Sequence, residues 1–492
     1  MAKNTTGKKS ALFRDVVSTY SGFILILPLS YLLRINYSRS LDLETFGLIY
    51  GLIAFLGIIT IFADFGQDNT FRHFASVALK KRNYKQVREL FWKTGSIQII
   101  LTVIITIILY ICSKPLAENY FLFPRGEPFI VGYLFFFLFI NITNPYRNIF
   151  IIYNQQKINY FADAIKHALI LGFTIYFLQQ DTPNLYHLGL SWAGSQIVAT
   201  AILIFIAIRR YPFLWDNIQI KIPKKDEFSF SFQVLISNFG NIFFQRLDII
   251  LITLFLTLAD VGIYSNSLSV LSIIGLFFAP LSAYIVPIIS RNTNNKKTLR
   301  KFIRALYKWG FLVSLPICIF LMIFSKEYLV ILFGEKFIAG VLLTQIFSIG
   351  VILKIYMQTN FHILIGLGKV KTRTILIFSL IVLNIILDIY FALQGNMVGI
   401  AFSTVFCWLL GFLATSKIIA TIAKIEIKVV TLAKIFISLL VFYVVVEMLR
   451  RVVTYNNWLE LLVVFPIAYG IYFLVARILN IYSLKQIKEL IQ

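Results

Sequence analysis

Charged residues are scarce in this 492-residue chain. Asp, Glu, Lys and Arg together make up 14% of it, whereas 59% of the residues are hydrophobic. A soluble domain of this length could not keep so much apolar surface away from water. The composition therefore excludes a soluble protein and predicts a membrane protein.

Cysteine and histidine are also rare, and neither is spaced for chemistry. The three cysteines, Cys112, Cys318 and Cys407, stand alone within or at the ends of apolar segments, which favours simple packing. The four histidines share no metal-ligand spacing. A P-loop for ATP is missing, because Ile363 occupies its first glycine position and Val370 its Ser/Thr position. We expect a transporter without cofactor or metal, not an enzyme, and any uphill transport must draw on a sodium, proton or substrate gradient.

Apolar stretches of roughly 20 residues fill the chain instead, each long enough to cross a hydrocarbon core of about 30 Å as a helix. Short polar or basic connections separate them. The pattern predicts an all-α polytopic membrane protein with about 14 transmembrane helices. The predicted crossings are 15–37, 45–67, 91–113, 128–151, 160–179, 187–208, 229–258, 261–290, 305–325, 339–366, 373–393, 396–418, 431–449 and 457–480.

The positive charge is distributed unevenly along the chain. Lys and Arg number 46 against 22 Asp and Glu, a formal net charge of +24. The basic residues gather in alternate connections, which is the positive-inside pattern and predicts that both termini are cytoplasmic. We therefore expect a multi-pass protein of the cytoplasmic (inner) membrane that contacts anionic lipids and no nucleic acid. The basic connections are 3–14, 72–93, 209–225, 291–304, 369–373 and 485–488.

Four short blocks recur in the same order about 210 residues apart, which predicts two homologous halves. Gly47 corresponds to Gly262 and Lys93 to Lys308, each 215 positions later. An even number of crossings per half makes the repeat parallel, an arrangement that encloses a central cavity able to open to either side. The predicted parts are an N-terminal six-helix lobe at 1–210, a cytoplasmic linker at 211–228, a C-terminal six-helix lobe at 229–420, and two extra transmembrane helices at 421–492.

Ionisable side chains inside predicted crossings are costly to bury, so each is a candidate functional group. Arg34, Arg246 and Lys354 are the candidate substrate-binding cations, because guanidinium and ammonium groups in a membrane cavity suit a phosphate or pyrophosphate. The candidate cavity or coupling carboxylates are Asp248, Asp388 and Asp163, and Lys166 and Asp64 complete the set.

Each candidate has a structural alternative. Arg246 and Asp248 can form buried ion pairs with neighbouring helices, and Arg34 can extend to the outer interface. Asp163 and Lys166, three residues apart on a helix, can neutralise each other.

Two stretches carry a resemblance to a known family. Residues 41–66 read LDLETFGLIYGLIAFLGIITIFADFG, and residues 246–291 read RLDIILITLFLTLADVGIYSNSLSVLSIIGLFFAPLSAYIVPIISR. Both contain an acidic residue shortly before a helix glycine, followed by an Asp-Phe-Gly or a Pro-x-x-Ser end. In these features the chain resembles the polysaccharide flippases of the multidrug, oligosaccharidyl-lipid and polysaccharide exporter superfamily.

The resemblance implies a flippase that moves isoprenoid-diphosphate-linked oligosaccharide to the outer leaflet, for cell-surface polysaccharide assembly of the O-antigen type. It implies a cationic cavity for the diphosphate, which Arg34, Arg246 and Lys354 can supply. It also implies glycan polymerases and glycosyltransferases as pathway partners.

Three alternatives remain open. A cation-coupled multidrug exporter of the same superfamily is disfavoured by the two unpaired crossings at 431–449 and 457–480. A lipid II flippase differs only in its substrate. A polytopic glycan polymerase needs catalytic residues in an outer loop or domain, and the outer connections here are short.

Overall fold

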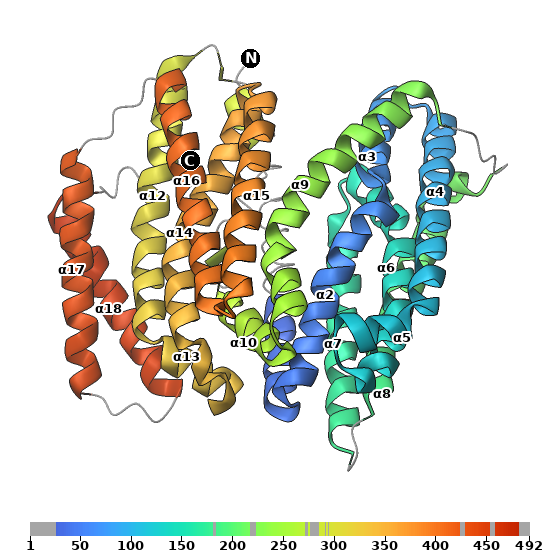
Figure 1. The fold of residues 1–492 in the computed structure, drawn as a ribbon. Coiled ribbons are helices and arrows are strands. Elements are labelled where there is room, and N and C mark those ends of the chain that lie inside the picture. The colour runs from blue at the N-terminus through green and yellow to red at the C-terminus, as the bar shows by residue number, and fades with distance from the viewer. Residues whose placement is uncertain are drawn as a thin grey trace. The chain divides into compact units, whose positions relative to one another are not determined.

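The computed structural model describes residues 26–180, 184–216, 223–270, 274–275, 285–290, 292–293, 295–423, 429–452 and 458–481. Throughout these ranges the secondary structure is helical and contains no β-strand (Figure 1). The all-α prediction is thus confirmed. The described residues form two compact units, one within 1–265 together with 392–395 and one within 266–391 together with 396–492.

The first unit is built from long helices joined by tight turns. Asp42 caps α2 by accepting a hydrogen bond from the Thr45 backbone N–H, and Asn83 caps α4 through the Gln86 N–H. Phe65 and Gly66 both have positive φ angles, so the chain turns sharply between α2 and α3. Residues 26–40 are helical and precede α2 (Leu43–Asp64), α3 (Gln67–Lys80), α4 (Tyr84–Ile111), α5 (Ser113–Pro115), α6 (Glu127–Ile152), α7 (Gln156–Leu178), α8 (Leu185–Arg210), α9 (Lys225–Phe255) and the start of α10 (Leu258–Leu268).

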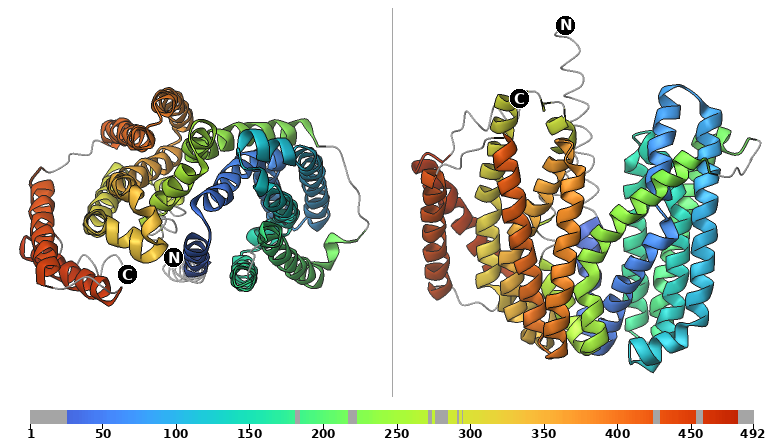
Figure 2. Two further views of the ribbon diagram at one scale, coloured as in Figure 1. Left: turned by 60° about the horizontal axis from the view of Figure 1, so that its bottom comes forward. Right: turned by 45° about the horizontal axis from the view of Figure 1, so that its top comes forward.

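The second unit repeats the pattern and adds a helix pair. Helices α17 and α18 lie side by side (Figure 2). They pack on each other and on α12 through buried side chains that include Leu312, Phe442 and Tyr472. The helices are α12 (Lys296–Ile323), α13 (Ser325–Phe333), α14 (Val341–Gly366), α15 (Val370–Leu393), α16 (Met397–Ala423), α17 (Val429–Val452) and α18 (Trp458–Ile478).

Ten of the described helices are long and apolar enough to cross a membrane, namely α2, α4, α6 to α9, α12 and α14 to α16. They correspond to ten of the predicted crossings. Helices α17 and α18 lie where the last two crossings are predicted, whereas the crossings at 15–37 and 261–290 fall partly outside the described residues. The full count of 14 and the orientation of the termini stay predictions.

Helix α12 begins earlier than the crossing predicted from residue 305. It starts at Lys296, because Asn295 accepts a hydrogen bond from the Thr298 N–H at 3.1 Å and so caps the helix. Hydropathy locates the membrane-crossing part of a helix and misses such basic extensions.

The two repeat-related glycines meet in the first unit. A Cβ on Gly47 would overlap the carbonyl oxygen of Leu258, and a Cβ on Gly262 would lie 3.0 Å from the carbonyl oxygen of Leu43. Leu43 and Leu258 are themselves 215 positions apart, as the glycines are. The contact is therefore reciprocal, as expected where equivalent helix starts of two homologous halves cross.

The predicted domain boundaries at residues 210 and 229 stay predictions. Helix α9 begins at Lys225 and packs against α2 and α3. The first compact unit accordingly extends past the predicted linker, of which residues 217–222 lie outside the described ranges.

Candidate functional site

Arg246 lies on α9 beside α2. Its Nε is 3.6 Å from the position that a Cβ on Gly57 would occupy. In the ranges that the structure describes, no hydrogen bond or ion pair engages its guanidinium. Asp248 and Arg34 both act on it electrostatically, with opposite signs. A guanidinium placed in this way is available to an anionic ligand.

Arg34 lies on the helical segment 26–40 and is held by its neighbours. Its guanidinium carbon is 3.9 Å from the centroid of the Tyr50 ring, a cation–π contact. Its Nη1 donates a hydrogen bond of 2.9 Å to the carbonyl oxygen of Ser265. An aromatic face and a backbone acceptor thus position Arg34, whose charge acts on Arg246.

Asp248 forms a hydrogen bond with a residue other than Arg246. Its carboxylate is buried and accepts a hydrogen bond of 2.6 Å from the Tyr264 hydroxyl. Two residues apart on a helix, Arg246 and Asp248 point in directions about 200° apart. The spacing therefore directs the two side chains to different sides of α9, while the charge of Asp248 still acts on Arg246.

The second unit holds Lys354 and Asp388. The Lys354 ammonium is 4.8 Å from the centroid of the Trp408 ring, which stabilises the cation. Asp388 is fully buried and accepts a hydrogen bond from the Ser403 hydroxyl on α16. Both side chains are therefore held by residues of their own unit.

Asp163 and Lys166 belong to a three-membered charge cluster. The Lys166 ammonium lies 3.0 Å from the Asp163 carboxylate, so the two neutralise each other. Arg147 on α6 adds a bidentate pair to the same carboxylate, one bond of which measures 3.0 Å. One carboxylate thus serves two cations, and its position suits the joining of α6 to α7 better than the binding of a substrate.

Asp64 has a local structural task. Its carboxylate accepts backbone N–H groups of Gly66 and Asp68 at 3.2 and 2.9 Å, and so caps the start of α3. Asp68 accepts a hydrogen bond of 2.6 Å from Asn148 on α6, and Asn148 accepts one from Arg72. Desolvation raises the pKa of the Asp68 carboxyl, against the opposing charge of Arg72 and the bond from Asn148.

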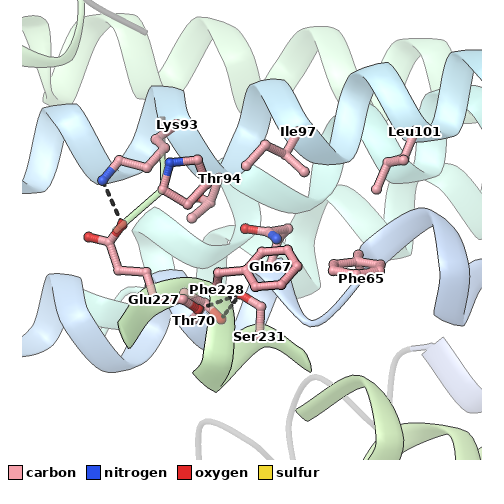
Figure 3. A pocket seen from close by; sticks show the side chains of 11 residues that line it. Phe65, Gln67, Thr70, Lys93, Thr94, Ile97, Leu101, Glu227, Phe228 and Ser231 are labelled. Atoms are coloured by element: carbon pink, nitrogen blue, oxygen red, sulfur yellow. Dashed lines mark hydrogen bonds and ion pairs between the residues drawn. The ribbon is translucent and has the colours of Figure 1, made fainter. Parts of the chain in front are cut away.

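A pocket of about 430 Å³ lies where α9 begins, between α3 and α4 (Figure 3). Four of its buried polar members form pairs across the helices: Lys93 with Glu227 at 2.7 Å, and the Thr70 and Ser231 hydroxyls at 2.8 Å. Phe65, Ile97, Leu101 and Phe228 are among its apolar members. These contacts attach the first turns of α9 to α3 and α4.

Several of these partners were not candidates in the sequence. Arg147, Lys93 and Glu227 are charged residues near predicted helix ends, where charge is common and uninformative. The sequence indicates that each buried charge needs a partner, but it does not indicate which residue is that partner. Within the described part of the chain, no group of three or more His, Cys, Asp or Glu side chains is arranged to hold a metal ion.

Relatives of this chain are membrane proteins and polysaccharide biosynthesis proteins. An uncharacterised membrane protein of Methanocaldococcus jannaschii is 22% identical over 94% of this chain and 95% of its own length. The teichuronic acid biosynthesis protein TuaB of Bacillus subtilis is 26% identical over 58% of each chain. A probable low-salt glycan biosynthesis flippase of Haloferax volcanii is 26% identical over 36% of this chain and 38% of its own length.

Solved structures of similar fold are transporters. The lipid II flippase MurJ, in an inward closed conformation, superposes with a TM-score of 0.68 at 13% identity, over 98% of this chain and 100% of its own. An inward-facing multidrug transporter of the MATE family gives a TM-score of 0.66 at 14% identity, over 81% and 96%. The chain therefore has the same fold as these two transporters.

The sequence family agrees with this fold. A family model described as "Polysaccharide biosynthesis protein" matches residues 12–293, more than half of the chain and the part that contains Arg34, Arg246 and Asp248. This multi-pass membrane protein therefore belongs to the polysaccharide biosynthesis protein family, with the fold of membrane flippases and exporters.

Proposed function

We propose that this protein moves an isoprenoid-diphosphate-linked oligosaccharide from the cytoplasmic to the outer leaflet by alternating access. Arg246 carries the proposal, because it is a guanidinium on a spanning helix without a hydrogen bond or ion pair in the described ranges. A cation at membrane depth is unfavourable unless water or an anionic ligand stabilises it. Its planar fork of N–H groups matches phosphate oxygens.

Arg34 and Lys354 complete the proposed set of cations. Each is held by an aromatic ring, Tyr50 or Trp408, at 3.9 and 4.8 Å. Such cation–π contacts fix the direction in which each cation points. The set would offer positive charge to a diphosphate in a medium where charge interactions are strong.

The extent of the structural matches favours a flippase over a drug exporter. The lipid II flippase matches 98% of this chain, whereas the multidrug transporter matches 81%. The relatives named for teichuronic acid and glycan synthesis favour a glycan-bearing lipid as cargo.

The proposed setting follows from the same function. The protein would cross the cytoplasmic membrane about 14 times with both termini inside. It would work without a cofactor, alongside glycosyltransferases and a glycan polymerase. Asp248 and Asp388 are the proposed carboxylates for any coupling to sodium or protons.

The decisive experiment is deletion of the protein followed by mass spectrometry of lipid-linked sugars in the membrane. Accumulation of a specific lipid-linked oligosaccharide on the cytoplasmic leaflet would support the proposal. Accumulation of lipid II would assign the protein to lipid II export. An unchanged lipid pool with increased drug sensitivity would favour a multidrug exporter. Loss of the polymer while flipping stays normal would favour a polymerase.

The Arg246→Ala variant tests the cation itself. Loss of a charged hydrogen-bonding partner typically weakens binding by about 2 kcal/mol or more, so we expect export to fall roughly 30-fold or more. Arg246→Lys should retain part of the activity, because it keeps the charge without the fork. Arg209→Ala, an exposed arginine at the end of α8, is the matched control. Full export by Arg246→Ala would refute the assigned role.

A further inference from the structure

Helix α9 carries a row of uncharged polar side chains that the proposed diphosphate site does not use. Ser229, Gln233, Ser237, Asn241 and Gln245 stand four residues apart, and all five are exposed. Side chains at this spacing form one ridge inclined to the helix axis, with steps of about 6 Å and a total length of about 24 Å, which turns about 160° around the helix from its first member to its last. We call these five residues the α9 polar row.

The α9 polar row is unusual for a spanning helix. No other candidate span in the described ranges carries a comparable row of exposed amides and hydroxyls. The only hydrogen bond recorded between these side chains joins Gln233 to Ser229 at 3.3 Å. Polar groups that face lipid without a partner are strongly unfavourable, so the row must face water or a polar ligand.

A neighbouring side of the same helix is apolar. Phe228, Phe232 and Ile236 are exposed there, with 54%, 48% and 42% of their surface accessible. Helix α9 is therefore two-sided along its first half. One side suits lipid, and the other suits a hydrophilic molecule.

The ends of α9 are fixed on both sides of this exposed middle part. Glu227 and Ser231 attach the first turns to Lys93 and Thr70, and residues 247–249 and 251–253 are buried against the unit. A helix held in this way presents its side chains with little loss of conformational freedom on binding.

The chemistry of the α9 polar row specifies its ligand. Amides and hydroxyls both donate and accept hydrogen bonds, and none of the five carries a charge. Such a surface complements a neutral molecule rich in hydroxyl groups. The row also ends at Gln245, the residue next to Arg246. A ligand whose anionic group is bound by Arg246 would therefore place its neutral part along the row.

We propose that the α9 polar row binds the sugar hydroxyls of the glycan headgroup while Arg246 binds its diphosphate; this rests on the proposed function. The row contributes to selection of the glycan. Arg246 recognises the diphosphate, which all such lipids share.

The test compares two probes on purified full-length protein in nanodiscs. The first is farnesyl diphosphate, which lacks sugar, and the second is the lipid-linked oligosaccharide fraction extracted from cells that lack the protein. The test variant is Gln233→Met/Asn241→Leu/Gln245→Met, which keeps side-chain size and removes the polar groups. At about fivefold per lost hydrogen bond, it should bind the glycolipid roughly 100-fold more weakly and farnesyl diphosphate as wild type does.

Two further variants separate binding from folding. Gln233→Asn/Asn241→Gln/Gln245→Asn keeps the amides and should restore part of the glycolipid binding. Phe232→Leu, on the apolar side of α9, should bind both probes normally. Equal glycolipid affinity of the apolar variant and wild type would overturn the proposal and make the row a water-facing surface only. Wild-type protein that binds neither probe would instead overturn the proposed function, and the row's role with it.

Discussion

Among single residues, charges on the spanning helices differ in how the protein satisfies them. The Asp163 carboxylate lies 3.0 Å from a guanidinium nitrogen of Arg147 and 3.0 Å from the Lys166 ammonium. The Lys93 ammonium lies 2.7 Å from the Glu227 carboxylate. Arg246 has no such partner in the described ranges. Paired charges hold helices together, whereas an unmatched cation at membrane depth calls for a ligand.

The Asp163 cluster gives a prediction about stability. Asp163→Asn would leave the buried Lys166 and the half-buried Arg147 without this counter-charge, so we expect a loss of about 3 kcal/mol in unfolding free energy. Lys166→Met keeps the pair between Arg147 and Asp163 and should cost much less. Thermal unfolding of the detergent-solubilised variants measures the difference. A larger loss for Lys166→Met than for Asp163→Asn would contradict the assignment.

At the scale of helices, α9 is attached at its start by an ion pair and a hydroxyl pair. Lys93 and Glu227 are 134 residues apart in sequence and nearly fully buried. Glu227 also accepts the backbone N–H of Lys224 at 2.8 Å and so helps to cap the helix. The Glu227 carboxylate therefore both caps the start of α9 and binds this helix to α4.

A double-mutant cycle tests this attachment. Lys93→Met or Glu227→Gln alone leaves one buried charge unpaired and should lower stability by about 3–5 kcal/mol. The double variant removes both charges, while the glutamine amide of Glu227→Gln keeps an acceptor for the Lys224 N–H, so much of the loss should be recovered. Melting temperatures of the four proteins give the coupling. Additive losses would show that the pair contributes no coupling energy.

The crossing of α2 with α10 depends on close backbone contact. Gly47→Ala would drive its methyl group into the Leu258 carbonyl and should destabilise by about 3 kcal/mol or more. Gly262→Ala meets the Leu43 oxygen at 3.0 Å and should cost less. Gly172→Ala has open space around it and should be neutral or stabilising by up to about 1 kcal/mol. Any other order in melting temperature would argue against this crossing.

At the scale of the whole molecule, the question is which connections face the cytoplasm. Within the first unit, the Trp92 indole donates to the Leu214 carbonyl at 2.6 Å, and the Tyr211 hydroxyl donates to Gln155 at 3.0 Å. These bonds bring the first turns of α4 together with the connections that follow α6 and α8. The grouping agrees with the positive-inside assignment of the basic connections at 72–93 and 209–225.

The native cysteines allow this topology to be tested. Cys112, at the far end of α4, is exposed, whereas Cys318 and Cys407 are buried. A membrane-impermeant maleimide should therefore label wild-type protein in intact cells, and Cys112→Ser should abolish the labelling. Lys81→Cys in that background should be labelled only after permeabilisation. Labelling of Lys81→Cys in intact cells would reverse the assigned orientation.

The sequence by itself determined the helices and their repeat. Apolar runs of membrane-spanning length can form only helices that satisfy their own backbone, so ten spans could be predicted from composition. The offset of 215 residues between Gly47 and Gly262 was equally visible, because a duplicated chain keeps its register.

Only the tertiary structure decided which charges meet. Arg147 joins Asp163, and Lys93 joins Glu227 across 134 residues, because helix packing brings distant segments together. The same packing left Arg246 beside Gly57 without a protein partner among the described residues. Pairing depends on where neighbouring helices cross, and hydropathy, which is alike along every span, carries no information about those crossings.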